Sequence, residues 1–124
     1  MIDFPRSVRV GEELHLEALV NYLCEHAPTI GPIQAIQQFP GGFSNLTYLL
    51  KTPDREYVLR RPPVGASVKG GHDMGREFRV LSLLKGHYDR VPGPIVNCET
   101  NDVIGAPFYV MERLSGVILR APMA

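Results

Sequence analysis

Proline and glycine punctuate this chain so often that only short helices and strands fit between them. The 124 residues include 11 prolines and 12 glycines, which favour turns over long regular elements. Because 44% of the residues are hydrophobic and 21% are charged, the composition is that of an ordinary globular protein and not of a disordered one. We therefore expect one folding unit of short elements joined by tight connections.

The periodicity of apolar residues predicts a helix, three strands, a second helix and two further strands. Helical spacing extends over residues 11–26, and again from Asp73, a capping residue, to Gly86. The first three strands follow one another with short turns and predict an antiparallel meander. Residues 62–72, rich in glycine and proline, predict an irregular loop. The predicted strands are 34–39, 46–52, 56–61, 92–97 and 107–112.

One carboxylate lies on an otherwise apolar helix face. Glu77 follows Met74 by three residues, so both side chains project from the same side of the second helix. A carboxylate that faces the core needs a partner. Because side chains alternate along a strand, only Arg60, and not Arg61, shares a face with Val58. We expect Arg60 to pair with Glu77, either as a structural ion pair or as a cation held for phosphate oxygens.

Two segments have backbone suited to a nucleotide. A glycine turn between the first two strands could let backbone amides approach a phosphate, although most such turns merely reverse the chain. The strand 107–112 runs into a polar turn, which leaves backbone groups free for a purine edge. Neither the P-loop pattern nor the dinucleotide-binding glycine pattern occurs. The glycine turn consists of Gly41, Gly42, Phe43, Ser44 and Asn45.

Charge and reactive residues argue against several other functions. The chain has 13 basic and 13 acidic residues, so no overall field favours nucleic acid or an anionic membrane. The four histidines are scattered and predict no metal site. Cys24 and Cys98 are isolated, which fits buried, inert thiols in a reduced compartment. With no leader-like start and no apolar run of about 20 residues, we expect a cytoplasmic protein that contacts neither nucleic acid nor membrane.

Four motifs together resemble the amino-terminal lobe of the aminoglycoside phosphotransferase and choline kinase superfamily, which has a protein-kinase-like fold. Within it they are similar to the phosphotransferase domain fused to some acyl-CoA dehydrogenases. The resemblance covers about residues 30–120 and implies an α+β fold: a five-stranded antiparallel sheet, a packed helix like the kinase C helix, and an extra amino-terminal helix. The motifs are residues 41–45 (GGFSN), 57–63 (YVLRRPP), 76–78 (REF) and 108–112 (FYVME).

The resemblance also implies roles in binding ATP with Mg²⁺. The glycine turn, residues 41–45, would cover the nucleotide phosphates. Arg60 would take the place of the lysine that contacts phosphates in protein kinases, and Glu77 would pair with it.

The adenine pocket follows from the same resemblance. Val58 would form its apolar ceiling and Met111 its back, while Glu112, Arg113 and Leu114 would form the hinge that receives the adenine edge. Without a second lobe, we expect an exposed apolar patch that includes Met111, Leu114 and 117–119.

In this superfamily the catalytic aspartate lies in an H-x-D-x-x-x-x-N loop of a carboxy-terminal lobe, with the magnesium-binding aspartate beyond it. That pattern is absent from the sequence. We therefore expect residues 1–124 to be the amino-terminal lobe of an enzyme that transfers the γ-phosphoryl group of ATP to a small-molecule hydroxyl, such as that of a hydroxyacyl compound. Two alternatives stay open: a non-catalytic nucleotide-binding or interaction module, and a structural domain in which the ion pair has no ligand.

Overall fold

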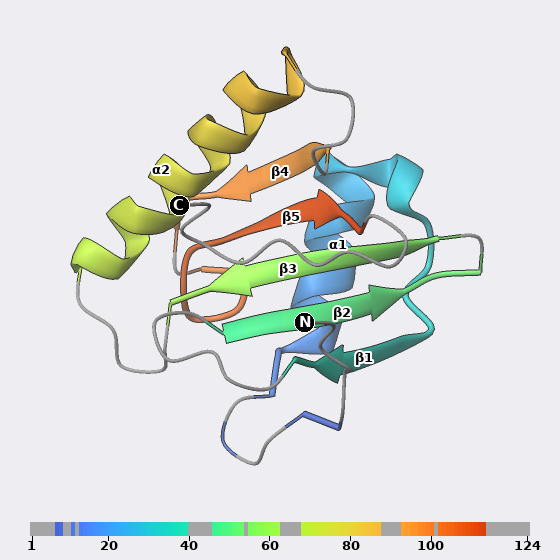
Figure 1. Cartoon of the computed structure of the whole chain (residues 1–124). Coiled ribbons are helices and arrows are strands. Elements are labelled where there is room, and N and C mark those ends of the chain that lie inside the picture. The colour runs from blue at the N-terminus through green and yellow to red at the C-terminus, as the bar shows by residue number, and fades with distance from the viewer. Residues whose placement is uncertain are drawn as a thin grey trace.

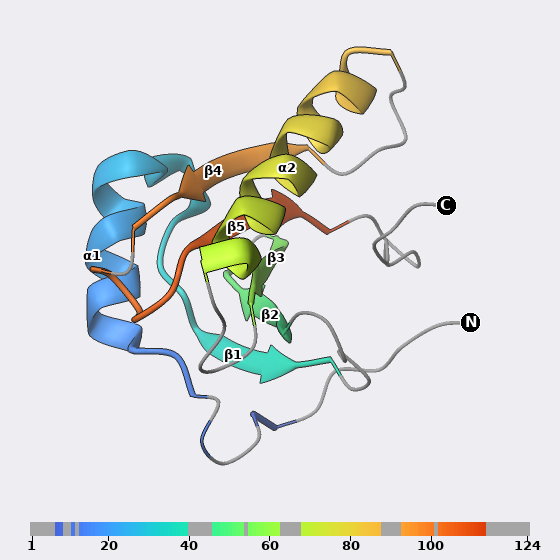
Figure 2. The same ribbon diagram turned by 90° about the vertical axis from the view of Figure 1, so that its left-hand side faces the viewer.

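A single sheet with a helix on each face forms the core of the protein (Figures 1 and 2). The computed structural model describes residues 7–8, 11, 13–39, 46–53, 55–62, 68–87, 93–100 and 102–113. The elements in chain order are α1 (Leu16–His26), the 3-10 turn η1 (Pro28–Ile30), β1 (Ala35–Gln38), β2 (Leu46–Lys51), β3 (Glu56–Arg61), α2 (Val68–Lys85), β4 (Pro94–Cys98) and β5 (Phe108–Glu112).

The five strands are antiparallel throughout, in the order β1-β2-β3-β5-β4. The first three form the predicted meander. β5 then pairs with β3, and β4 takes the outer edge. β3 is therefore the central strand, and its register with β5 sets Arg60 opposite Tyr109 and Val58 opposite Met111.

One face of the sheet packs against α1. Leu19 and Leu23 from this helix are buried against side chains that alternate along the strands, as an amphipathic helix and a half-buried sheet require. The strand residues in this cluster are Leu46, Tyr48, Leu50, Tyr57, Leu59, Phe108 and Val110, with Cys98 at the end of β4. This hydrophobic cluster stabilises the fold by burial of apolar surface.

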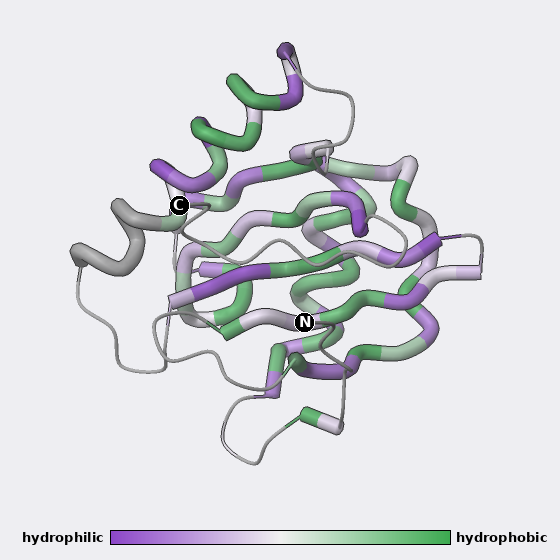
Figure 3. The backbone as a smooth tube through the Cα atoms, in the orientation of Figure 1, coloured by the Kyte–Doolittle hydropathy of each residue, from purple (hydrophilic) through white to green (hydrophobic). Residues whose placement is uncertain are grey.

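The opposite face packs against α2, as the side view shows (Figure 2). Met74 and Leu81 from the helix are buried there, with Phe78 packed against them. The sheet contributes Phe39, Leu49, Val58, Tyr109 and Met111. Hydrophilic residues lie at both ends of β3, with hydrophobic residues between them (Figure 3).

The predicted fold class is confirmed, while two helix starts differ from prediction. α1 begins at Leu16 and not at residue 11, because His15 caps it: the Nδ1 atom of His15 accepts the Ala18 amide at 3.2 Å. α2 begins at Val68 and not at Asp73, so the end of the predicted loop 62–72 is helical. Glycine disfavours a helix by only about 1 kcal/mol per residue, and the packed turns from Met74 onward outweigh that cost.

Two further observations concern the surface. Cys24 is exposed and Cys98 is buried, so the expectation of two buried thiols is wrong for Cys24, which lies on the solvent side of α1. No helix among the described residues is long and apolar enough to cross a membrane.

The packing of α1 makes a direct stability prediction. Leu19 is fully buried, whereas Leu16 of the same helix is 50% exposed. Leu19→Ala should lower the free energy of unfolding by about 3 kcal/mol, because it removes buried methyl groups and leaves a cavity. Leu16→Ala, the matched control, should cost less than about 1 kcal/mol. Urea denaturation followed by circular dichroism measures both, and equal losses would contradict the packing described.

Candidate functional site

A mostly buried cluster of three polar side chains joins the sheet to α2. The Nη1 atom of Arg60 lies 3.2 Å from the Oε1 atom of Glu77. The Tyr109 hydroxyl donates a hydrogen bond to the same Oε1 atom at 2.9 Å. Only 9% of the Arg60 side chain and 21% of the Glu77 side chain are exposed to solvent. One carboxylate oxygen therefore receives two donors in a largely desolvated setting, which strengthens both interactions.

The side-chain periodicity of the strand or helix positions Arg60 and Glu77. Arg60 follows Val58 by two residues on β3, so both side chains face α2. Glu77 lies one helical turn from Met74 and Leu81 on the packed face of α2. The predicted Arg60–Glu77 pairing is thus confirmed. Whether the pair binds phosphate stays a prediction.

Arg61 points to the other side of the strand and takes a different partner. It is buried, and its Nε atom donates to the carbonyl oxygen of Pro62 at 3.0 Å. The alternation argument therefore separates the two neighbouring arginines correctly.

Tyr109 is the member that the sequence reasoning missed. It stands directly opposite Arg60 in the β3–β5 register, and its ring makes an edge contact with Phe78, with centroids 5.9 Å apart. A signal was available, because Tyr109 and Met111 are two residues apart on one strand and so share a face. What the sequence lacked was the register that sets Tyr109 against Arg60.

The environment of the cluster has two electrostatic consequences. The Nε atom of Arg60 is buried and has no hydrogen-bond partner within the described part of the chain, and an unsatisfied buried donor is costly. Burial raises the pKa of the Tyr109 hydroxyl well above its usual range, and the Glu77 carboxylate adds to this effect, while the Arg60 cation opposes it.

The two predicted apolar contacts to a base lie side by side. Val58 and Met111 are opposite each other in the β3–β5 register and are each 2% exposed. The expectation that Met111 is exposed is therefore wrong, because α2 and Phe39 pack over the same face of the sheet. Leu114 and residues 117–119, the rest of that expected patch, lie outside the described residues.

The predicted hinge already uses its first two amides within the protein. The Glu112 amide donates to the carbonyl oxygen of Gly93 at 2.9 Å, and the Arg113 amide donates to that of Glu56 at 3.2 Å. The Glu112 side chain also accepts the Gly93 amide at 3.1 Å. Neither of these two amides is therefore left to donate to a purine edge. Leu114 and the glycine turn, Gly41–Asn45, lie outside the described residues.

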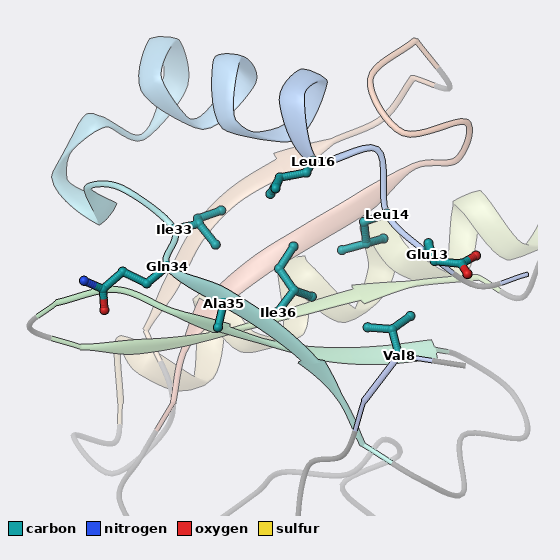
Figure 4. Close-up of a pocket in the computed structure, with 8 residues that line it drawn as sticks. All are labelled: Val8, Glu13, Leu14, Leu16, Ile33, Gln34, Ala35 and Ile36. Atoms are coloured by element: carbon teal, nitrogen blue, oxygen red, sulfur yellow. The ribbon is translucent and has the colours of Figure 1, made fainter. Parts of the chain in front are cut away.

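Metal-binding clusters and pockets are the other two features that could form a site. Among the described residues, no group of three or more His, Cys, Asp or Glu side chains could hold a metal ion. A mostly apolar pocket of about 220 Å³ lies beside β1 on the α1 side of the sheet, away from the Arg60 cluster (Figure 4). The pocket is lined by Val8, Glu13, Leu14, Leu16, Ile33, Gln34, Ala35 and Ile36.

Comparison with known proteins matches residues 35–124 to the model of the phosphotransferase enzyme family. The chain is 37% identical over 119 residues to acyl-CoA dehydrogenase family member 10 of Mus musculus. The matched stretch covers 94% of this chain and 11% of that protein. It is also 37% identical over 108 residues to family member 11 of Homo sapiens, covering 84% of this chain and 14% of that protein.

A solved structure agrees with these matches. The crystal structure of a Ralstonia eutropha protein, provisionally assigned as an aminoglycoside phosphotransferase, superposes with a TM-score of 0.69 at 36% identity. The match covers 87% of this chain and 30% of that one. The chain therefore spans less than a third of each relative named here.

The raised pKa of Tyr109 predicts how stability depends on pH. Because the folded state holds this proton more tightly than the unfolded state, the contribution is complete below about pH 10, the usual tyrosine value, and is lost as the pH rises further. Urea denaturation between pH 8 and 11 should show the free energy of unfolding of Tyr109→Phe falling less steeply than that of wild type.

A second tyrosine provides the comparison. Burial, with a smaller effect of Cys98, raises the pKa of Tyr22 to about 12, so Tyr22→Phe should remove a separate part of the same slope. If Tyr109→Phe keeps the full wild-type slope, the Tyr109 hydroxyl is not held in the desolvated position described here.

Proposed function

Because the chain belongs to the phosphotransferase enzyme family, we propose that it is the ATP-binding lobe of an enzyme that transfers the γ-phosphoryl group of ATP to a hydroxyl of a small molecule. The observation that carries this proposal is the ion pair between the buried Arg60 and the partly buried Glu77. It joins the central strand to the packed helix, where the kinase-like fold holds the cation that contacts the nucleotide phosphates.

The chemistry of Arg60 suits that role. A guanidinium presents several N–H donors in one plane and matches the geometry of phosphate oxygens. Glu77 engages the Nη1 atom and fixes the orientation of the group. The Nε atom has no partner among the described residues, so a donor is left for an anionic oxygen. Phosphoryl transfer depends mainly on such positioning and charge stabilisation.

The base would then lie along the sheet from Arg60. Val58 and Met111 form an apolar surface two residues further along their strands, on the same face as the Arg60 cluster. The glycine turn, residues 41–45, would cover the phosphates, and the amide of Leu114 would contact the purine edge. When bound, Mg²⁺ would neutralise charge on the β- and γ-phosphates. Since Glu77 already has two partners, it enters this proposal as an orienting group and not as a metal ligand.

Two parts of the reaction rest on relatives. The names of the two curated relatives described above refer to acyl-CoA dehydrogenases, which favours a hydroxylated acyl compound as the acceptor. The H-x-D-x-x-x-x-N pattern that would supply the catalytic aspartate is absent from the 124 residues. A second candidate for residues 1–124 by themselves is a module that binds nucleotide without transferring phosphate.

Substitution of Arg60 tests the proposal. Arg60→Met keeps much of the stem and removes the cation, and it should weaken ATP binding by at least about tenfold, the equivalent of one charge-assisted hydrogen bond. Arg60→Lys should keep part of the affinity, because lysine keeps the positive charge but lacks the planar set of N–H donors of a guanidinium. Isothermal titration calorimetry with ATP and Mg²⁺ measures both. The matched control is Arg55→Met, because Arg55 is 68% exposed and pairs with Glu112 instead.

The folding of each variant has to be checked, because removing one partner of a buried ion pair can cost several kcal/mol. Thermal unfolding monitors this. A folded Arg60→Met variant that binds ATP as well as wild type would reduce the pair to a structural role and would overturn the proposal.

A further inference from the structure

A second arginine lies over the surface that the proposed function assigns to the base. The guanidinium carbon of Arg113 lies 5.4 Å from the centre of the Phe39 ring, over its face. The Nη1 atom of Arg113 also contacts the Oε1 atom of Glu56 at 2.9 Å, and only 16% of the Arg113 side chain is exposed. This cation is therefore held in place by an aromatic face and a carboxylate together.

The sheet topology fixes where this contact lies. Phe39 follows β1 and Arg113 follows β5, and both β2 and β3 lie between those strands. The two residues also belong to opposite ends of the sheet. The Phe39 amide donates to the carbonyl oxygen of Thr47, which is paired with Arg60 across β2 and β3. The Arg113 amide donates to the carbonyl oxygen of Glu56, at the other end of β3.

Such residues can meet only by reaching diagonally over one face. That face is the one towards α2, because the Phe39 side chain is buried in the same cluster as Leu49, Val58 and Met111. Leu49 and Val58 are directly opposite each other on the two intervening strands. The Phe39–Arg113 contact thus covers the apolar surface that the proposed function gives to the purine.

We propose that Arg113 is a placeholder for the base. In the nucleotide-free protein its planar guanidinium stacks on Phe39, and a purine displaces it, breaks its contact with Glu56 and stacks on the Phe39 ring instead. This inference rests on the proposed function and adds to it a base-stacking residue and a built-in competitor. A flat cation and a flat base both favour the face of an aromatic ring, so one position can accept either.

The test compares binding of ATP with binding of tripolyphosphate, each with Mg²⁺, by calorimetry. Arg113→Ala should bind ATP about threefold to tenfold more tightly than wild type, because the competing stack is gone. Its affinity for tripolyphosphate, which has no base, should not rise. Glu56→Gln should shift ATP binding in the same direction by a smaller factor, because Arg113 loses its anchor. Arg55→Ala is the matched control and should leave both affinities unchanged.

The role of Phe39 is measured in the absence of the competitor. In the Arg113→Ala background, Phe39→Leu should weaken ATP binding by about fivefold or more, the range of base–aromatic stacking, and leave tripolyphosphate binding unchanged. NMR gives a readout that does not depend on affinity. The Arg113 side-chain protons should be shifted upfield by the Phe39 ring in the free protein, and this shift should disappear at saturating ATP and in Phe39→Leu.

The outcomes separate the two proposals. If Arg60→Met weakens ATP binding while Arg113→Ala has no effect, the placeholder is wrong and the nucleotide site stands. If the upfield shift of the Arg113 side-chain protons persists at saturating ATP, the placeholder proposal is also wrong, while the proposed nucleotide site is unaffected. If no variant binds either ATP or tripolyphosphate, the proposed function fails, and the placeholder fails with it.

Discussion

The burial of two opposite charges between β3 and α2 is the constraint on which the rest of this structure depends. A desolvated guanidinium or carboxylate is costly alone, and the pair is tolerated only when its geometry is good and further hydrogen bonds are made. Arg60, Glu77 and Tyr109 meet these conditions in part through one shared oxygen, while the Nε atom of Arg60 has no partner among the described residues. The rotation of α2 about its axis and the register of β3 with β5 must both be correct for this oxygen to receive both donors.

One face of the sheet mainly stabilises the fold, and the other carries the candidate site. The hydrophobic cluster under α1 gains stability by burial. The face under α2 combines an apolar surface around Val58 with charged groups at its two ends, Arg60 at one and Arg113 at the other. A ligand with a flat apolar part and an anionic tail matches that arrangement. β3, central in the sheet, contributes to both faces because its side chains alternate.

Sequence periodicity predicted the features that depend on one helix or strand by itself. It did not predict the contacts between different helices and strands. The strand positions, the core-facing Glu77 and the choice of Arg60 over Arg61 all follow from periods of 2 and 3.6 residues. Tyr109 was missed because its importance comes from register, which the sequence did not specify. Met111 was expected to be exposed because packing across the sheet is not visible in a motif. The contact of Phe39 with Arg113 spans three strand pairings, beyond any sequence spacing.

The use of arginine at position 60 fits the same physical argument. The group remains charged under burial, whereas a buried lysine readily loses its proton. It also engages Glu77 through the Nη1 atom while keeping further N–H donors on the same planar group. Glu77 and Tyr109 therefore order the guanidinium before any ligand arrives, so an incoming phosphate would not bear the entropic cost of fixing that side chain. Interactions prepared in this way contribute most to charge stabilisation, because little reorganisation is left to occur during the reaction.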